Sequence, residues 1–228
     1  MKVTLSFEES ESDDVSIMVD ALRASSTIVL ALDIFEKVIP CFTKEDAFKL
    51  KDKLDGVVAG ERGGKKIDGF DIGNSPSRIK DYKTDKNTLI LTTSNGTRIL
   101  ENMHSTVLVG SLINAKYVAG QSVKIAKDHI DVVMAGVKGK FAIEDFLASG
   151  EILYWITQEL PDCELSEYAQ SAILASRPSE SLKSFINSRS GKRLIELGYE
   201  NDVELCSLKN ITSNVAIYKN QELTLLKD

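Results

Sequence analysis

Residues that commonly act as soft metal ligands or imidazole bases are scarce in this sequence. Among 228 residues there are three cysteines (Cys41, Cys163 and Cys206) and two histidines (His104 and His129), and none is spaced from another as metal ligands are. The odd number of cysteines and the lack of a CxxC pair argue against a disulfide framework or a zinc site and fit a reducing cytoplasm. A Ser-His-Asp triad would need one of the two histidines, so both are poor candidates.

Long hydrophobic runs and an excess of basic residues are also missing. No apolar run approaches the roughly 20 residues of a membrane span, and the N-terminal MKVTLSFEESESDD turns acidic too early for a signal peptide. The formal net charge of −6 suits solubility better than binding to a phosphate backbone, which needs clustered Lys and Arg. We therefore expect a cytoplasmic protein with no membrane or nucleic-acid partner. The sequence leaves monomer and homo-oligomer both open.

Alternating apolar runs and helical periodicities predict an α/β protein with a mostly parallel sheet between layers of helices. The length fits one large domain or two α/β lobes, residues 1–125 with most of the site motifs and residues 126–228, although the composition marks no boundary. The C-terminal region is expected to form helices over residues 166–197 and then a hairpin turning at 219–220. The predicted strands cover residues 16–19, 37–42, 57–60, 87–93, 106–110 and 130–137.

Polar residues gather just after four of these strands. In a parallel sheet the carboxyl ends of the strands share one edge, where ligands bind, so the four clusters should meet. They are residues 20–27 with Asp20 and Arg23, residues 61–64 with Glu61 and Arg62, residues 92–98 with Thr93 and Arg98, and residues 138–145 with Glu144 and Asp145.

Two of these clusters indicate an oxyanion site. TTSNGTR and ASST place small hydroxyls at a helix N-terminus, where free amides and the helix dipole favour an anion. Arg98 falls in a first helical turn, where the dipole disfavours a cation, so a bound anion or a carboxylate would explain it. In the alternative reading, Ser25 or Ser26 caps a helix and Asn95-Gly96 is a plain turn.

The acids near the strand ends suggest a hard cation. Two or three carboxylates at one edge, without His or Cys, would suit Mg²⁺, which prefers oxygen ligands. Ion pairs with Arg23, Arg62 and Arg98 would explain them equally well, and residue types alone leave both open. There is no GxxxxGK[ST] loop, no GxGxxG and no HExxH. The acids in question are Asp20, Glu61, Asp71, Glu144 and Asp145.

Six sequence blocks in this order and spacing resemble the 2-phosphosulfolactate phosphatase (ComB-like) family. They are VDALRASSTIVLAL, GERGG, GFDIGNSP, LTTSNGTRIL, VGSLINA and AGVKGKFAIEDFLASGEIL, which run from residue 19 to about residue 153, and the tail SGKRLIELGYENDVELC is similar too. The resemblance implies a ComB-like α/β fold and a Mg²⁺-dependent phosphatase. It also implies the hydrolysis of (R)-2-phospho-3-sulfolactate to 3-sulfolactate and phosphate, a step toward coenzyme M.

The resemblance also implies the site residues. Small departures at Ala21-Leu22, Ser25 and Ser94 keep size or hydroxyl character, so they leave the chemistry intact. The family pattern carries over at Asp20, Arg23, Ser25, Ser26, Thr27, Glu61, Arg62, Asp71, Asn74, Ser75, Pro76, Thr93, Asn95, Gly96, Thr97, Arg98, Glu144 and Asp145.

From this set we predict roles. Asp20, Glu61 and Asp71 are the expected metal ligands and bases, and Glu144 or Asp145 is expected to orient water. Arg23, Arg62 and Arg98 should hold the anionic groups, because arginine binds oxyanions with a planar fork. The turn at Asn95, Gly96 and Thr97 should donate amides. The remaining predicted substrate ligands are Ser25, Ser26, Thr27, Asn74, Ser75 and Thr93.

Three functions stay open at this point. The chain could be the phosphosulfolactate phosphatase, a phosphatase of the same build acting on another small phosphorylated acid, or a non-catalytic binder of small anions. The nucleophile is open as well, since Asp20 could be phosphorylated or water could attack directly.

Overall fold

The computed structural model describes residues 1–93, 96–101 and 103–227, and the side chains of residues 97, 98 and 101 lie outside the described part. Eleven strands in this part of the chain form a single sheet. They are β1 (Lys2–Phe7), β2 (Val15–Val19), β3 (Lys37–Cys41), β4 (Val57–Arg62), β5 (Lys65–Lys66), β6 (Thr88–Thr92), β7 (Thr106–Gly110), β8 (His129–Met134), β9 (Glu164–Leu165), β10 (Ala216–Lys219) and β11 (Glu222–Leu225).

The sheet consists of two parallel blocks joined by the C-terminal hairpin. Its order is β5-β4-β6-β3-β11-β10-β7-β2-β8-β1-β9. Strands β4, β6 and β3 are parallel to one another, as are β7, β2, β8, β1 and β9. The hairpin β10–β11 pairs antiparallel with β7 and β3, and it turns through Asn220 and Gln221, both at positive φ. Because β8 lies between β1 and β2, the sheet is continuous across residue 125, and the two-lobe division stays a prediction.

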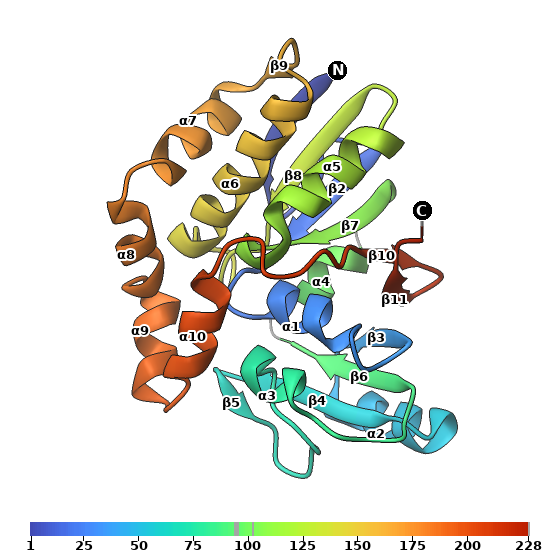
Figure 1. The fold of residues 1–228 in the computed structure, drawn as a ribbon. Coiled ribbons are helices and arrows are strands. Elements are labelled where there is room, and N and C mark those ends of the chain that lie inside the picture. Colours follow the sequence, from blue (N-terminus) through green and yellow to red (C-terminus); the bar gives the residue numbers. More distant parts are fainter. Residues whose placement is uncertain (94–95, 102, 228) are drawn as a thin grey trace.

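Helices cover the sheet on both faces (Figure 1). Helices α5, α6 and α7 lie over the block that contains β7, β2 and β8, and α8, α9 and α10 continue along the left side of the view. A 3₁₀ turn at Leu112–Asn114 precedes α5. The helices are α1 (Ala24–Ala31), α2 (Lys44–Leu54), α3 (Pro76–Lys80), α4 (Gly96–Glu101), α5 (Ala115–Ile125), α6 (Ile143–Glu159), α7 (Glu167–Ser176), α8 (Glu180–Ile186), α9 (Arg189–Glu196) and α10 (Glu200–Ser207).

Helix α1 is enclosed by the two blocks of the sheet. All eight of its residues are buried, and Val29 of α1 belongs to the same apolar cluster as Val109 of β7 and Leu91 of β6. On the opposite face of the block that contains β7, β2 and β8, Ile17 and Val132 pack with α5, α6 and α7 in a second cluster. Both blocks therefore pack against α1, and this arrangement brings the carboxyl ends of their strands to the same place. The predicted α/β class with a mostly parallel sheet is confirmed.

The local differences from the sequence prediction have physical causes. Strand β1 was not predicted. The apolar residues Ile28, Ala31, Leu32 and Phe35 have helical spacing and predict a helix from residue 28, but α1 begins four residues earlier, at Ala24. A helix that is buried all round has no polar face, so ASSTIVLA carries little helical periodicity. A proline in a strand predicts a sheet edge or a strand end, yet β3, which contains Pro40, is internal. The pairing with β11 is limited to Val38 and Leu223, so Pro40 needs no donor on that side.

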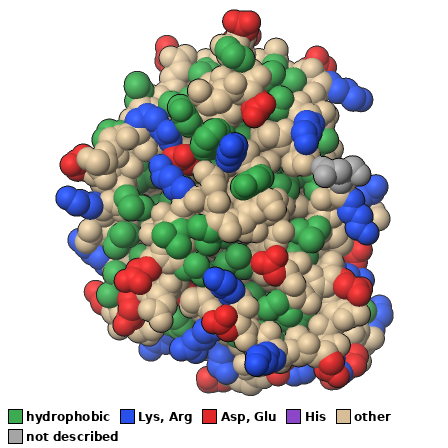
Figure 2. Space-filling model, in the orientation of Figure 1, with side chains coloured by type: hydrophobic (Ala, Val, Ile, Leu, Met, Phe, Trp, Pro, Cys, Tyr) green, Lys and Arg blue, Asp and Glu red, His purple; other side chains and the backbone are tan. Residues whose placement is uncertain are grey.

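The surface is mixed in charge. On the face seen in Figure 2, basic and acidic side chains are interspersed with apolar ones over both halves of the molecule. Among the described residues, none of the helices combines the length and apolar character needed to cross a membrane.

Candidate active site

A cavity of about 560 Å³ opens where the carboxyl ends of β2, β4, β6 and β8 meet. Each of the four strands contributes residues from the polar cluster at its carboxyl end, as predicted, but the reason differs from the prediction. Strands β4 and β6 run opposite to β2 and β8, because the hairpin β10–β11 pairs antiparallel with both blocks, so the clusters meet through the packing of both blocks against α1 and not along one edge of a parallel sheet. Helix α9 supplies the remaining wall. The lining residues are Asp20, Leu22, Arg23, Glu61, Gly63, Gly64, Asn74, Thr93, Val137, Lys138, Lys140, Arg189, Ser190, Arg193 and Leu194.

Asp20 follows β2 directly and is 7% exposed. Its Oδ1 accepts a hydrogen bond from the Ala24 amide at 3.3 Å, and the Gly96 amide also donates to the carboxylate. Burial raises the pKa of Asp20 to about 7. The negative charges of Glu61 and Glu144 also raise this pKa, and the hydrogen bonds from the two amides lower it. A cation bound near these carboxylates would relieve that repulsion.

Glu61 is held by the GERGGKK segment, which forms a hairpin turn between β4 and β5. Arg62 pairs with Lys65, and the two turn residues, Gly63 and Gly64, have φ of +60° and +86°. Two-residue hairpins of this twist need positive φ at both positions, which glycine adopts without strain. The Gly64 amide donates to Glu61 Oε2 at 2.7 Å. The turn therefore fixes the Glu61 carboxylate at the cavity.

Glu144 and Asp145 open α6 behind Asp20, and both are 3% exposed. Asp145 accepts hydrogen bonds from the Ala21 amide at 2.8 Å and the Gly136 amide at 2.9 Å, which ties the ends of β2 and β8 together. Burial, together with the charges of Asp20 and Glu144, raises the pKa of Asp145 well above its usual range. Neither acid lines the cavity, so a role in orienting water stays a prediction.

Three predicted substrate ligands do line the cavity: Arg23, Asn74 and Thr93. The Arg23 guanidinium is buried and donates from Nη1 to Asp202 at 2.7 Å and from Nη2 to the Gly64 carbonyl at 2.9 Å. Asn74 is 3% exposed, and its Oδ1 has no hydrogen-bond partner in the described structure. Exchanging the two amide atoms would leave a buried NH₂ unpaired instead, so either orientation leaves Asn74 suited to a ligand.

The three hydroxyls of α1 lie in the core and do not line the cavity, so their expected role in binding substrate stays a prediction. Ser25 Oγ accepts from the Asp20 amide at 2.9 Å, and Ser26 Oγ is 2.7 Å from Ser111 Oγ. Thr27 is fully buried. Because both blocks of the sheet enclose α1, these side chains support the Asp20 loop from behind and do not reach the cavity. Neither Ser25 nor Ser26 caps α1, since the N-cap residue is Arg23 and no side chain caps the helix.

Asp71 does not line the cavity, so its expected role as a metal ligand stays a prediction. Its carboxylate pairs with Lys51 at 2.7 Å and accepts from the Val58 amide at 2.9 Å. It lines a separate hollow of about 380 Å³. Arg62 also lies away from the cavity and is exposed. Side chains alternate along a strand, so with Glu61 facing the cavity, Arg62 turns to the other side, where it donates to the Glu61 and Phe42 carbonyls.

The remaining predicted residues divide into two groups. Ser75 is fully buried and donates to Asp202 at 2.7 Å, so it acts behind the cavity wall. Gly96 is placed beside Asp20 as expected. Asn95 lies outside the described residues, and the side chains of Thr97 and Arg98 are outside the described part as well.

The sequence analysis missed the basic wall of the cavity. Lys138 and Lys140 flank Gly139 in a tight turn after β8, and Arg189 and Arg193 project from α9. A signal was present: Arg189 occupies the first turn of a helix, where the dipole disfavours a cation, which is the reasoning already applied to Arg98. These four basic side chains line the same cavity as the carboxylates of Asp20 and Glu61.

The donor set of the cavity fits a hard divalent cation. No group of three or more His, Cys, Asp or Glu side chains gathers as a metal site among the described residues. Mg²⁺ does not need such a group, because it keeps several waters and takes one or two carboxylates. Asp20 and Glu61 supply those carboxylates, and the unpaired Oδ1 of Asn74 supplies a third oxygen.

Comparison with known proteins identifies the family of this chain. The family model for 2-phosphosulpholactate phosphatase matches residues 3–221. A protein of Methanothermobacter thermautotrophicus named 2-phosphosulfolactate phosphatase is 47% identical over 229 residues, covering 100% of this chain and 97% of that protein. One of the same name from Methanocaldococcus jannaschii is 34% identical, covering 97% and 96%. A probable 2-phosphosulfolactate phosphatase of Clostridium acetobutylicum is 35% identical, covering 95% and 94%. The chain therefore belongs to the 2-phosphosulfolactate phosphatase family.

Proposed function

We propose that this protein hydrolyses the phosphate ester of 2-phospho-3-sulfolactate, giving 3-sulfolactate and phosphate, with Mg²⁺ as cofactor. The observation that carries the proposal is the cavity itself, which is lined by the buried carboxylates of Asp20 and Glu61 and by four basic side chains, Lys138, Lys140, Arg189 and Arg193. A substrate with a phosphate, a carboxylate and a sulfonate on three carbons needs such a basic wall. Phosphoryl transfer depends mainly on positioning and on charge neutralisation.

Asp20, Glu61 and Asn74 are the residues that would hold the cation. Bound there, Mg²⁺ polarises a phosphoryl oxygen and lowers the pKa of a coordinated water. Asp71 is left out of this set, because Lys51 already pairs with it in a separate hollow. The raised pKa of Asp20 supports the assignment, since carboxylates that repel one another in a buried site gain most from a cation.

The basic residues would bind the anionic groups of the substrate. Arg23 follows Asp20 closely in the chain and lines the same cavity, so it suits the phosphate. Lys140, Arg189 and Arg193 also line the cavity and suit the carboxylate and the sulfonate. Arginine binds such oxyanions with two parallel N–H donors.

We further propose that water, and not Asp20, attacks the phosphorus. The amides of Ala24 and Gly96 hold the Asp20 carboxylate, which suits a fixed ligand. A single displacement by water inverts the configuration at a chiral phosphorus, whereas passage through an aspartyl phosphate retains it. Inversion is expected. Retention, or an acid-stable phosphoryl group trapped on Asp20, would establish the covalent route instead.

The function is tested by phosphate release from phosphosulfolactate, phosphoglycerate and phospholactate, each with Mg²⁺ and with EDTA. Release that EDTA abolishes, fastest with phosphosulfolactate, is the expected result. Faster release from one of the other acids would assign the chain to a different phosphorylated acid, the second candidate. Tight binding of all three without release would favour an anion-binding protein.

A pair of variants tests the basic wall. Arg193 lines the cavity and Lys192 next to it does not, so Arg193→Gln and Lys192→Gln remove the same charge from the same helix. Arg193→Gln should raise KM for phosphosulfolactate roughly tenfold, the cost of one charge-assisted hydrogen bond, and less for phospholactate. Lys192→Gln should leave both KM values unchanged. Equal effects of the two variants would count against the assignment.

We place the reaction in the cytoplasm and in a coenzyme M type pathway, without nucleic acid or membrane as partner. The reduced state of the three cysteines and the mixed surface charge in Figure 2 support the location. Loss of 3-sulfolactate from a cell extract after immunodepletion of this protein would support the pathway. An unchanged level would argue for another source.

A further inference from the structure

Asp202 of α10 makes a buried polar junction next to the cavity without lining it. The residue is 1% exposed. Its Oδ2 accepts from Arg23 Nη1 at 2.7 Å, and its Oδ1 accepts from Ser75 Oγ at 2.7 Å and from the Ser77 amide at 3.1 Å. The Ser77 hydroxyl donates to the same oxygen. One carboxylate thus joins α10 to two segments far away in the sequence.

The junction fixes the orientation of Arg23. Besides the bond to Asp202, the guanidinium donates from Nη2 to the Gly64 carbonyl at 2.9 Å and lies over the Tyr199 ring, 4.5 Å from its centroid. These bonds use two of the five N–H donors of an arginine. Three donors remain for an anion in the cavity, held in a fixed plane. A fixed donor set loses less entropy on binding than a mobile one.

The same junction also fixes two further parts of the cavity. Through Arg23 it reaches Gly64 in the turn that holds Glu61. Through Ser75 it fixes the residue next to Asn74. Each of these parts carries a group that the proposed function places on the phosphate or the cation. Asp202 itself touches neither, because it does not line the cavity.

We propose that Asp202 is a positioning residue, which orients Arg23 toward the substrate phosphate. The inference rests on the proposed function and adds to it a residue of the C-terminal helices. A purely structural ion pair is the competing explanation. Replacing a buried pair of that kind often costs little if both partners go, whereas removing one partner is destabilising. A stability measurement alone therefore does not distinguish the two roles.

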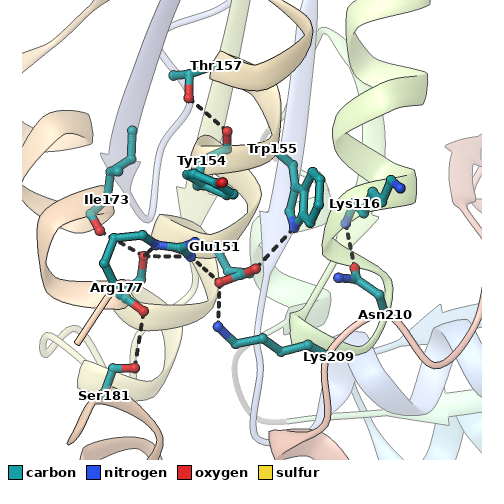
Figure 3. A network of polar contacts seen from close by, with 11 residues as sticks. Lys116, Glu151, Tyr154, Trp155, Thr157, Ile173, Arg177, Ser181, Lys209 and Asn210 are labelled. Carbon is teal, nitrogen blue, oxygen red and sulfur yellow. Dashed lines mark hydrogen bonds and ion pairs between the residues drawn. The ribbon is translucent and has the colours of Figure 1, made fainter. Parts of the chain in front are cut away.

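The chain offers a matched control in the cluster around Glu151, shown in Figure 3. Glu151 of α6 is buried like Asp202 and binds Arg177, Lys209 at 2.6 Å and Trp155 Nε1 at 3.0 Å. Arg177 lies over the Tyr154 ring, much as Arg23 lies over Tyr199. None of these residues lines the cavity. Glu151→Gln should therefore lower stability without changing ligand binding.

The experiment measures 3-sulfolactate and inorganic phosphate binding by calorimetry at a fixed Mg²⁺ concentration. Asp202→Asn keeps an acceptor for Ser75 and turns an amide NH₂ toward Arg23, which releases the guanidinium. We expect the Kd of inorganic phosphate, the group assigned to Arg23, to rise about tenfold, the cost of one charge-assisted hydrogen bond, and the Kd of 3-sulfolactate to change less. In an Arg23→Gln background the same substitution should change Kd less than about twofold, because both changes remove one interaction. Glu151→Gln should leave Kd unchanged.

The outcomes separate the inference from the proposed function. Equal losses from Asp202→Asn in both backgrounds, or no loss in either, would overturn the positioning role while leaving the phosphatase activity of the unaltered protein intact. Failure of the unaltered protein to bind 3-sulfolactate or release phosphate would instead overturn the function. If Asp202→Asn does not fold, Asp202→Glu keeps the charge and lengthens the side chain. It should fold and still weaken binding, and unchanged Kd in it would refute the role.

Discussion

Replacing Asp20 by asparagine should make the metal-free protein less sensitive to pH. Burial and the charges of Glu61 and Glu144 raise the pKa of Asp20 from 3.8 to about 7. Between these values the folded protein keeps a proton that the unfolded chain releases. The stability from this group is therefore fully present below pH 3.8 and is lost as the pH rises through 7. At about 1.4 kcal/mol per pH unit, the loss reaches about 4 kcal/mol.

Urea denaturation in EDTA measures the effect. Between pH 5 and pH 7.5 the free energy of unfolding should fall by about 2.5 kcal/mol more in the unaltered protein than in Asp20→Asn, from the same two pKa values. Asp145 changes stability in the same direction in both proteins, because its pKa is also raised. The exposed Asp68→Asn controls for the loss of a surface charge.

Magnesium gives the second arm of the same experiment. A cation bound by Asp20 and Glu61 replaces the proton, so adding Mg²⁺ at pH 7.5 should restore most of the stability of the unaltered protein and little of that of Asp20→Asn. If the free energy of unfolding changes equally with pH in the two proteins, ionisation of Asp20 does not destabilise the folded protein. The reasoning for a cation at this site would then lose its main support.

Three further substitutions test the placement of single residues. Asp71→Asn should leave Mg²⁺ affinity and kcat unchanged and alter stability by less than about 1 kcal/mol, because it removes only a half-exposed pair; a loss of Mg²⁺ binding would return Asp71 to the ligand set. Ser25→Ala should cost about 1–3 kcal/mol in urea denaturation, because it leaves the buried Asp20 amide without an acceptor; no change would mean that another group replaces the hydroxyl. Gly96→Ala should lower kcat with an unchanged circular dichroism spectrum, because its Cβ would lie 3.0 Å from the Ala24 Cβ and 3.2 Å from Asp20 Oδ2; full activity would show that Asp20 tolerates the displacement.

The polar clusters at the strand ends were predictable from the sequence, but the reason for their convergence was not. Parallel strands present Glu61 and Thr93 at one edge of their block, whereas Asp20 belongs to the block of opposite direction and meets them because both blocks pack against α1. The hydrophobic periodicity of the sequence does not reveal that α1 lies inside the fold. Its sequence ASSTIVLA has hydroxyls where an exposed helix would have charges, and a prediction from the local sequence assigns those hydroxyls to a ligand. Enclosure by two blocks of the sheet turns them into core groups.

The positions of Asp71 and Arg62 outside the cavity have another cause. Both residues stand near a predicted strand end, and distance along the chain was the basis for including them. Whether a residue reaches the cavity depends instead on the direction in which its side chain points. Arg62 is one residue from Glu61 and points to the opposite side of β4, and Asp71 folds back to cap the start of that strand at the Val58 amide.

The C-terminal helices make contacts that the local sequence does not predict. Asp202 is 179 residues from Arg23, and the sequence around neither residue indicates that the two form an ion pair. Yet α9 supplies Arg189 and Arg193 to the cavity and α10 supplies the carboxylate behind Arg23. The residues proposed for the cation and the phosphate lie between positions 20 and 96. Those proposed for the other anionic groups lie between 138 and 193. If this division holds, substitutions on α9 should change which phosphorylated acid is chosen, while substitutions at Asp20 or Glu61 should stop hydrolysis of every one of them.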